Sequence, residues 1–311
     1  MSRPVAALTG VTGFLGGPLA DALQQAGYQV RALARRDVAA GGIEVVRGAL
    51  EDEAALERLV QGAEVVVHAA GAIKARRREA FFSINAEGAR RLAVIAAREV
   101  PGARFVLVSS LSAREPGLSD YAASKAAGEA AVRDVLGPGR VTIARPPAIY
   151  GPGDKETLAA FQAVQRLPLA PLPGGEGARL AMLHVADAAA QIAALASRPP
   201  GGATYGLADA RPGGYGWREI MGEAARAVGR REPRFVRLPR ALVLGIGSAA
   251  GALGRLGGGV PILSAGKARE MLHPDWSLRP EELAPGLPAP RFDLASGFTD
   301  TVAWYRAQGW L

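Results

Sequence analysis

A tyrosine and a lysine four residues apart are the residues of this sequence best placed for acid–base chemistry. Tyr121 and Lys125 stand in the segment YAASK, at the start of a helix-like stretch, 121–136. Residues four apart on a helix share one face. A tyrosine hydroxyl, with an ordinary pKa of about 10, exchanges protons poorly at neutral pH, and a nearby ammonium lowers that pKa. The pair can then give a proton to a substrate oxygen or take one from it.

Two polar residues upstream could act with this pair. Ser110 closes the apolar run 103–109, and the carboxyl end of a parallel strand faces the ligand crevice. Its hydroxyl can hydrogen-bond the substrate oxygen that Tyr121 protonates. Asn85, in the segment SINAEG, precedes them in a helical stretch. Its amide is compatible with a proton relay and equally with a helix-bending or water-holding role.

A glycine series near the N-terminus predicts a phosphate cradle. The apolar run 4–9 stops at T-G-x-x-G-x-x-G, where a buried strand would turn into a helix. Backbone N–H groups at a helix N-terminus attract anions, and a missing Cβ lets a pyrophosphate come close. We therefore expect a dinucleotide against Thr9, Gly10, Thr12, Gly13, Phe14, Leu15 and Gly16.

Alternating segments must position these residues. Strand-like runs occupy 4–9, 28–34, 43–47, 64–69, 103–109 and 140–145, and helix-like stretches lie between them at 14–26, 52–61, 79–99 and 121–136. Such alternation predicts an α/β fold, a doubly wound parallel sheet of the Rossmann type.

The second half has loops rich in proline and glycine and shorter elements, which predicts a smaller lobe. We expect a dinucleotide-binding domain over 1–167, with later segments returning to it, and a substrate lobe with a closing helix over 168–311. Proline and glycine predict loops at 168–177 and 285–290, and helices are expected at 185–197, 217–228 and 295–308.

Composition excludes several classes of function. The 311 residues are 49% hydrophobic and 21% charged, which is typical of a globular protein. There is no cysteine for a disulfide or thiolate, and the three histidines are too far apart in sequence to suggest a metal site. The net charge of +8 is carried by scattered arginines, which argues against a nucleic-acid partner and suits an anionic small-molecule ligand.

Targeting signals and membrane spans are also not expected. The first strand begins at about residue 4, which leaves no room for a signal peptide. The longest apolar run, 241–254, is interrupted by glycines and is shorter than the roughly 18–20 residues of a membrane span. The sequence therefore predicts a cytoplasmic protein.

Taken in order, these motifs resemble the extended short-chain dehydrogenase/reductase family, which includes NAD(P)-dependent epimerases and dehydratases. The resemblance covers nearly the whole chain, including HAAG at 68–71, HVAD at 184–187 and the closing WYRAQGWL. It implies catalysis by Tyr121 and Lys125, with Ser110 rather than Ser109 or Ser112 as the serine. It also implies that the cofactor contacts Ala69, Ala70, Gly71, Tyr121, Lys125, Pro146 and Ile149, the last two in RPPAIYGPGD.

The end of the second strand favours NADP(H), with NAD(H) as the alternative. Ala34 stands where an NAD enzyme usually has an acid, and Arg35 and Arg36 follow it. Arginines there can bind a 2′-phosphate. After the third strand the family often has G-D-L, whereas this chain has Gly48-Ala49-Leu50. Leu50 is then a cofactor contact, and Glu51 or Asp52 would have to replace the missing aspartate.

The resemblance implies hydride transfer between nicotinamide C4 and a carbonyl or alcohol carbon. Ten residues separate Ser110 from Tyr121, where sugar-nucleotide enzymes usually carry a longer acidic loop, so we favour an NADP-dependent reductase of a small or apolar carbonyl compound. The apolar segment 238–263 either lines its pocket or is a packed helix. The alternatives are a sugar-nucleotide epimerase, using Arg179, Arg218 or Arg237, and a non-catalytic cofactor-binding protein. The sequence leaves a homodimer open.

Overall fold

The chain forms two compact units, each assembled from separate stretches of sequence. The computed structural model describes residues 3–38, 41–173, 175, 177–199, 201–256 and 264–311. The first unit comprises Met1–Pro146, Ala188–Gly206 and Ala284–Pro288, and the second comprises Pro147–Asp187, Leu207–Leu283 and Ala289–Leu311. Residues 147–167, which we expected in the first domain, therefore belong to the second unit, and two later segments return to the first.

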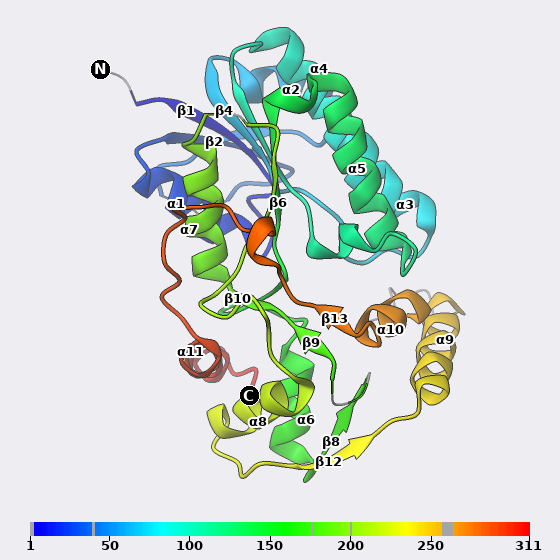
Figure 1. Cartoon of the computed structure of the whole chain (residues 1–311). Helices are drawn as coiled ribbons and strands as arrows, with labels where there is room; N and C mark the ends of the chain where they lie inside the picture. The colour runs from blue at the N-terminus through cyan, green and yellow to red at the C-terminus, as the bar shows by residue number, and fades with distance from the viewer. Residues whose placement is uncertain (1–2, 39–40, 174, 176, 200, 257–263) are drawn as a thin grey trace. The chain divides into compact units, whose positions relative to one another are not determined.

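A seven-stranded parallel sheet forms the centre of the first unit (Figure 1). The strand order is β11-β6-β5-β4-β1-β2-β3, so the chain reverses direction across the sheet beside β1. The strands are β1 (Val5–Thr9), β2 (Gln29–Ala34), β3 (Glu44–Arg47), β4 (Ala63–His68), β5 (Arg104–Val108), β6 (Val141–Arg145) and β11 (Thr204–Gly206). The doubly wound fold expected from the sequence is confirmed.

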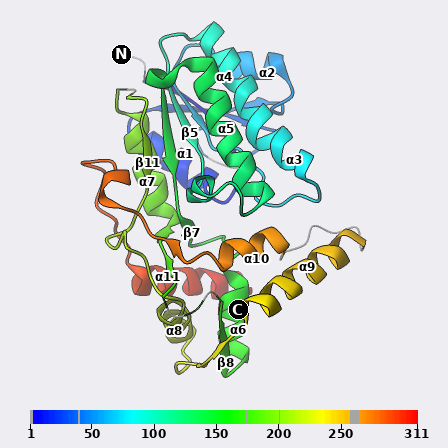
Figure 2. The ribbon, with the colours of Figure 1, turned by 45° about the vertical axis from the view of Figure 1, so that its right-hand side comes forward.

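Helices cover both faces of this sheet (Figures 1 and 2). On one face the apolar sides of α2 (Glu53–Val60), α4 (Gly88–Glu99) and α5 (Asp120–Leu136) pack on strand residues such as Val66 and Ile143. On the other lie α1 (Gly16–Gln25) and α7 (Val185–Ala196). Because both faces are covered, the central strands carry continuous apolar runs, VVV in β4 and FVLV in β5.

The expected helix 79–99 is interrupted in the structure. It consists of α3 (Arg78–Phe82), a π-helical turn (Ser83–Glu87) and α4. Short 3-10 turns lie at Leu111–Arg114 and Pro138–Arg140. The π-helical turn contains Asn85 and therefore displaces this residue from the regular helical register.

Three short parallel strand pairs and a helical core make up the second unit. The pairs are β10–β7, β12–β8 and β13–β9. The strands are β7 (Ala148–Tyr150), β8 (Leu169–Leu172), β9 (Arg179–Leu180), β10 (Met182–His184), β12 (Arg234–Arg237) and β13 (Asp275–Trp276). The helices are α6 (Leu158–Arg166), α8 (Trp217–Ala227), α9 (Arg240–Leu256), α10 (Ala265–Met271), a 3-10 turn (Pro280–Glu282) and α11 (Leu294–Ala307).

Aromatic side chains form the core of this unit. Tyr150 and Phe161 each pack edge-on against Phe298, with ring centroids 5.0 and 4.9 Å apart, respectively. The strand β8 corrects our expectation of a loop throughout 168–177: its Ala170 and Leu172 are buried in an alternating pattern. Over the part of the chain that the structure describes, no helix is long and apolar enough to cross a membrane.

Candidate active site

The glycine turn is the first component of the site. It joins β1 to α1, the strand–turn–helix context that the sequence predicts. Gly10 has a positive φ of 83°, and a Cβ there would lie 2.6 Å from backbone atoms of Ala69 and Ala70. A Cβ on Gly16 would lie 2.1 Å from the carbonyl oxygen of Gly10. Glycine is therefore required at both positions by the packing of the turn itself.

Gly13 differs from these two glycines because the protein leaves room beside it. Its backbone N–H donates to the Gly10 carbonyl oxygen at 2.9 Å, and a Cβ would meet only that oxygen, at 3.2 Å. Thr12 and Gly13 are exposed, Phe14 and Leu15 are half-buried, and no side chain caps the N-terminus of α1. An exposed glycine before an uncapped helix end fits the approach of a pyrophosphate.

A buried histidine holds the end of β1 against β4. Thr9 Oγ1 accepts a hydrogen bond from the Ala70 N–H at 3.2 Å and lies 2.7 Å from His68 Nδ1. The donor in this contact depends on the imidazole tautomer, since a threonine hydroxyl can donate to Nδ1 or accept from it. Burial, aided by the charge on Lys125, lowers the pKa of His68 to about 3, so the ring is neutral. Sequence reasoning missed this contact, because only the polar types of the two residues pointed to it.

Lys125 reaches the carboxyl edge of the sheet from α5. Its side chain is buried, and Nζ donates to the Val108 carbonyl oxygen at 2.8 Å. Burial lowers its pKa to about 8, although Glu129, one turn further along α5, acts in the opposite direction. A Cβ on Gly71 would lie 3.7 Å from Nζ, so the HAAG segment passes beside the ammonium.

Asn85 joins the same cluster through the π-helical turn. Its Oδ1 accepts from the Ala72 N–H at 2.7 Å, and its Nδ2 donates to the Ala72 carbonyl oxygen and to Ser124 Oγ, at 3.0 and 2.9 Å. Ser124 Oγ in turn donates to the Tyr121 carbonyl oxygen at 2.7 Å. The turn packs tightly on α5, since a Cβ on Gly128 would lie 2.3 Å from the Asn85 carbonyl oxygen.

Tyr121 lies in the first turn of α5 and is half-buried, with its ring centroid 6.2 Å from that of Phe81. Ser119 is the N-cap of this helix, and its hydroxyl accepts from the Ala122 N–H at 3.0 Å. This N-cap fixes the helix start and with it the four-residue phase between Tyr121 and Lys125.

The adjacent serines after β5 have different surroundings. Ser109 Oγ is buried and donates to Glu129 Oε1 at 2.5 Å, and Arg145 holds the same carboxylate with bonds of 2.8 and 2.6 Å. Ser110 is half-buried, and its Oγ accepts from the Ser112 N–H at 3.2 Å. The hydroxyl of Ser109 is thus engaged in an internal network that sequence reasoning missed.

The remaining predicted cofactor contacts lie at other loops. The Pro146 carbonyl oxygen accepts from the Leu111 N–H at 2.9 Å, which ties the end of β6 to the residue after Ser110. Leu50 is in contact with Gly88 at the start of α4. Ile149 lies on β7, in the second unit. Asp52 caps α2 by accepting from the Ala55 N–H at 3.0 Å, while Glu51 is exposed.

The end of β2 carries two arginines. Ala34 is buried, and Arg35 and Arg36 are exposed. The first carboxylate after them, Asp37, forms an ion pair with Arg47 at the end of β3.

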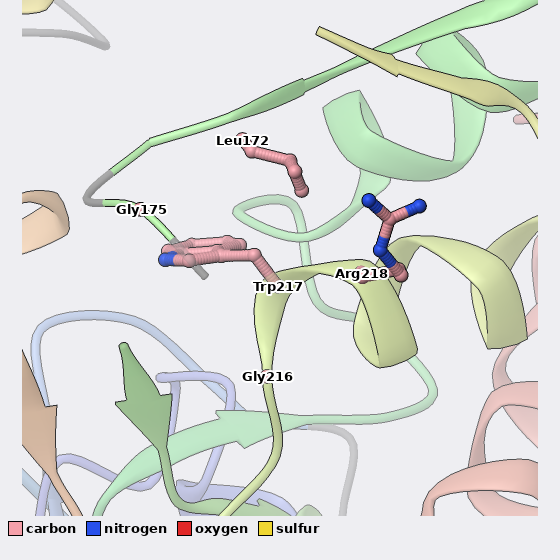
Figure 3. Close-up of a pocket in the computed structure, with 5 residues that line it drawn as sticks. All are labelled: Leu172, Gly175, Gly216, Trp217 and Arg218. Carbon is pink, nitrogen blue, oxygen red and sulfur yellow. The ribbon is translucent and has the colours of Figure 1, made fainter. Parts of the chain in front are cut away.

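The second unit contains a cavity of its own. It has a volume of about 260 Å³ and is lined by Leu172, Gly175, Gly216, Trp217 and Arg218. Figure 3 shows the indole of Trp217 extending from the start of α8 toward Gly175. The guanidinium of Arg218 lies 4.4 Å from the ring centroid of Phe235.

A parallel sheet in this strand order, with a glycine turn after β1, places the chain in the Rossmann class of α/β folds. Within that class the chain belongs to the NAD dependent epimerase/dehydratase family, whose model matches residues 6–207. The resemblance found in the sequence is thereby confirmed. Over the described residues, no group of acids and histidines is arranged to hold a metal ion.

Individual relatives include reductases. The chain is 49% identical over 315 residues to a ceramide reductase of Caulobacter vibrioides, an alignment that covers 100% of this chain and 97% of that protein. It is 31% identical over 229 residues to a Stigmatella aurantiaca ketoreductase of a farnesylated dihydroquinoline oxide, covering 66% of this chain and 68% of that protein. These similarities support an NAD(P)-dependent oxidoreductase activity.

Solved structures support the fold. The dTDP-glucose 4,6-dehydratase DesIV from Streptomyces venezuelae, solved with NAD bound, matches with a TM-score of 0.74. The match covers 98% of both chains at 22% sequence identity.

Proposed function

We propose that this chain is an NADPH-dependent reductase that converts a ketone on a long-chain, ceramide-type lipid into an alcohol. The observation that carries the proposal is the buried Lys125 ammonium one helical turn from Tyr121, with Nζ bound to the Val108 carbonyl oxygen at 2.8 Å. A cation held there stabilises the phenolate of Tyr121 and so makes its hydroxyl a stronger acid. This is the proton donor that carbonyl reduction requires.

The residues of the first unit fit a bound NADPH, which would supply the hydride. The open position at Gly13 and the uncapped start of α1 suit a pyrophosphate. Lys125 uses one N–H on Val108 and retains two for ribose hydroxyls. Asn85, tied to Ala72 and Ser124, holds the loop after β4 beside Lys125.

Ser110 and Tyr121 would handle the substrate oxygen. Ser110 stands at the carboxyl end of β5 with a half-buried hydroxyl, whereas the Ser109 hydroxyl is engaged with Glu129. In the proposed step Ser110 donates a hydrogen bond to the carbonyl oxygen and polarises the bond. Tyr121 gives its proton to that oxygen as the carbon is reduced.

The substrate class follows from the relatives. Both reductases act, by their names, on molecules with long apolar groups. The base of a ceramide carries hydroxyls, so a reducible form needs a ketone in place of one of them, because a hydride adds to an electrophilic carbon.

The proposed preference for NADPH rests on the end of β2. Arg35 and Arg36 are exposed there, and Asp37, the next residue in the sequence, forms an ion pair with Arg47. A 2′-phosphate bound there would therefore meet two cations.

A sugar-nucleotide substrate is the second candidate, favoured by the arginines of the second unit. Arg218 lines the cavity, and Arg179 Nη1 lies 3.8 Å from the position of a Cβ on Gly216, another lining residue. Two guanidinium groups beside one cavity could hold a diphosphate.

The test is NADPH oxidation by the purified protein with keto-ceramide in mixed micelles, with NADH and with nucleotide-linked keto sugars in parallel. We expect turnover of the keto lipid that prefers NADPH. Turnover of the keto sugars alone, or NAD that stays bound through purification with no lipid turnover, would overturn the proposal in favour of the second candidate.

A further inference from the structure

Helix α9 exposes apolar side chains on the face next to its packing contact. Val243 is buried and packs with Ala268 and Leu272 at α10. Leu242 and Ile246, one turn apart, are 49% and 46% exposed. We expected the apolar segment 238–263 either to line a pocket or to form a packed helix. Its described part forms a helix that is packed on one side. Residues 257–263 lie outside the described residues.

The strand pair that leads into α9 has a similar outer face. The register pairs Leu169 with Arg234 and Pro171 with Val236, so these four side chains share one face of the β8–β12 ladder. Leu169 and Val236 are 47% and 43% exposed on it, while Ala170 and Leu172 are buried on the other face.

The segment that precedes and starts helix α9 is rich in arginine. Residues 230–240 contain one acid, Glu232, against five arginines: Arg230, Arg231, Arg234, Arg237 and Arg240. Helix α9 itself has no acidic residue over its 17 positions. Exposed leucine and isoleucine that directly follow an exposed, arginine-rich segment of the chain complement a surface that is apolar beneath and anionic on top.

We infer that the α9 face, defined as Leu242 and Ile246 together with the arginines of 230–240, binds the surface of an anionic lipid bilayer. Leucine and isoleucine would enter the boundary between headgroups and acyl chains, and the arginines would contact the phosphates. The helix would lie on the membrane, since no described helix meets the requirements for crossing one.

A second copy of the chain is a weaker occupant. In a symmetric pair the same surface meets itself, which would bring the arginines of 230–240 of one protomer close to those of the other. Like charges brought together oppose association, whereas an anionic bilayer attracts all of them.

Binding to vesicles tests this inference without cofactor or substrate, so its result is independent of the proposed reductase activity. The full chain is sedimented with vesicles of phosphatidylcholine containing phosphatidylglycerol and, in parallel, with vesicles of phosphatidylcholine alone. We expect binding to the anionic vesicles that weakens in high salt, because salt screens exposed charges.

Two variants separate the apolar and the charged contributions. Leu242→Gln/Ile246→Gln should weaken vesicle binding about tenfold or more. Arg230→Gln/Arg231→Gln should weaken it about fivefold for each arginine removed. The control is Val94→Gln, at a 38% exposed position on α4 in the first unit, which should bind like the unchanged chain. Thermal unfolding should be unaltered in all three, since these side chains are already exposed.

Three results would overturn the inference. The first is failure of the full chain to sediment with anionic vesicles. The second is unchanged binding by Leu242→Gln/Ile246→Gln. The third is a dimer in solution, seen by light scattering, that this same variant dissociates while no vesicle binding occurs, which would assign the α9 face to a second copy.

Discussion

Replacing Gly13 by alanine should weaken cofactor binding while leaving the fold intact. A Cβ there would meet only the Gly10 carbonyl oxygen, at 3.2 Å, and Gly13 does not have a positive φ. The added methyl group would therefore project into the space that we assign to the pyrophosphate. Losing one or two backbone hydrogen bonds to that charged group, at about 1.5–3 kcal/mol each, weakens NADPH binding about 10- to 100-fold or more.

The expected effect on stability is small. Alanine at a compatible position restricts the unfolded chain by about 0.4–1 kcal/mol, which offsets the tight contact with Gly10. The melting temperature of the unliganded protein should then change by no more than about 2–4 °C. Fluorescence titration with NADPH measures the affinity, and thermal unfolding with and without NADPH reports the loss of ligand stabilisation.

Neighbouring glycines supply matched controls. A Cβ on Gly16 would lie 2.1 Å from the Gly10 carbonyl oxygen, so Gly16→Ala should destabilise the fold by about 1–3 kcal/mol or more. Gly17 has no atom within 4 Å of its Cβ position, and alanine there should raise stability by about 0.5–1 kcal/mol. If Gly13→Ala binds NADPH as tightly as Gly17→Ala does, the pyrophosphate does not lie at Gly13.

Three further predictions concern titration and cofactor choice. His68 is neutral in the fold with a pKa of about 3, and its ordinary value is 6.5, so the unfolded state takes up the proton first as the pH falls. The free energy of unfolding should therefore drop by ~1.6 kcal/mol between pH 6.5 and 5 in urea titrations, and His68→Leu should remove that part of the slope. With a Lys125 pKa of about 8, kcat/KM for carbonyl reduction should fall as pH rises above that value; a profile flat to pH 10 would contradict the role of the ammonium. Arg35→Gln/Arg36→Gln should raise the KM for NADPH about tenfold or more and leave that for NADH unchanged, as initial rates with both cofactors would show.

The central elements of the fold could be predicted because the apolar pattern of each segment agrees with the place that the segment takes in the sheet. The apolar runs of β1, β4 and β5 are continuous, since helices cover both faces of the sheet, and the glycine turn marks the exact kind of junction that follows β1. Helices α5 and α11 were also predictable, each beginning at a capping side chain, Ser119 and Asp293.

The unit boundary could not be read from the sequence. The chain leaves the first unit after Pro146 and returns at Ala188 with most of α7 and then β11. Strand β11 has only three residues, too few for a recognisable pattern, and joins the sheet through pairing with β6. Strand β8 was also not predicted. It has only four residues, and the prolines in and around it are typical of a loop.

Parts of the site were equally hidden. The π-helical turn places Asn85 against Ala72 and Ser124, but an altered turn within a helix leaves the apolar spacing on both sides almost unchanged. The sequence showed Ser109 and Ser110 side by side, and only the structure shows that Glu129 holds the first of them.

The most direct test of the central claim is carbonyl reduction by the unchanged chain and by Tyr121→Phe, measured with keto-ceramide in mixed micelles and NADPH. Removing the hydroxyl takes away the proposed proton donor but leaves Lys125 and the glycine turn in place. We expect turnover to fall about 10²- to 10⁴-fold while NADPH still binds. Full turnover by Tyr121→Phe would contradict the assignment of Tyr121 as the acid.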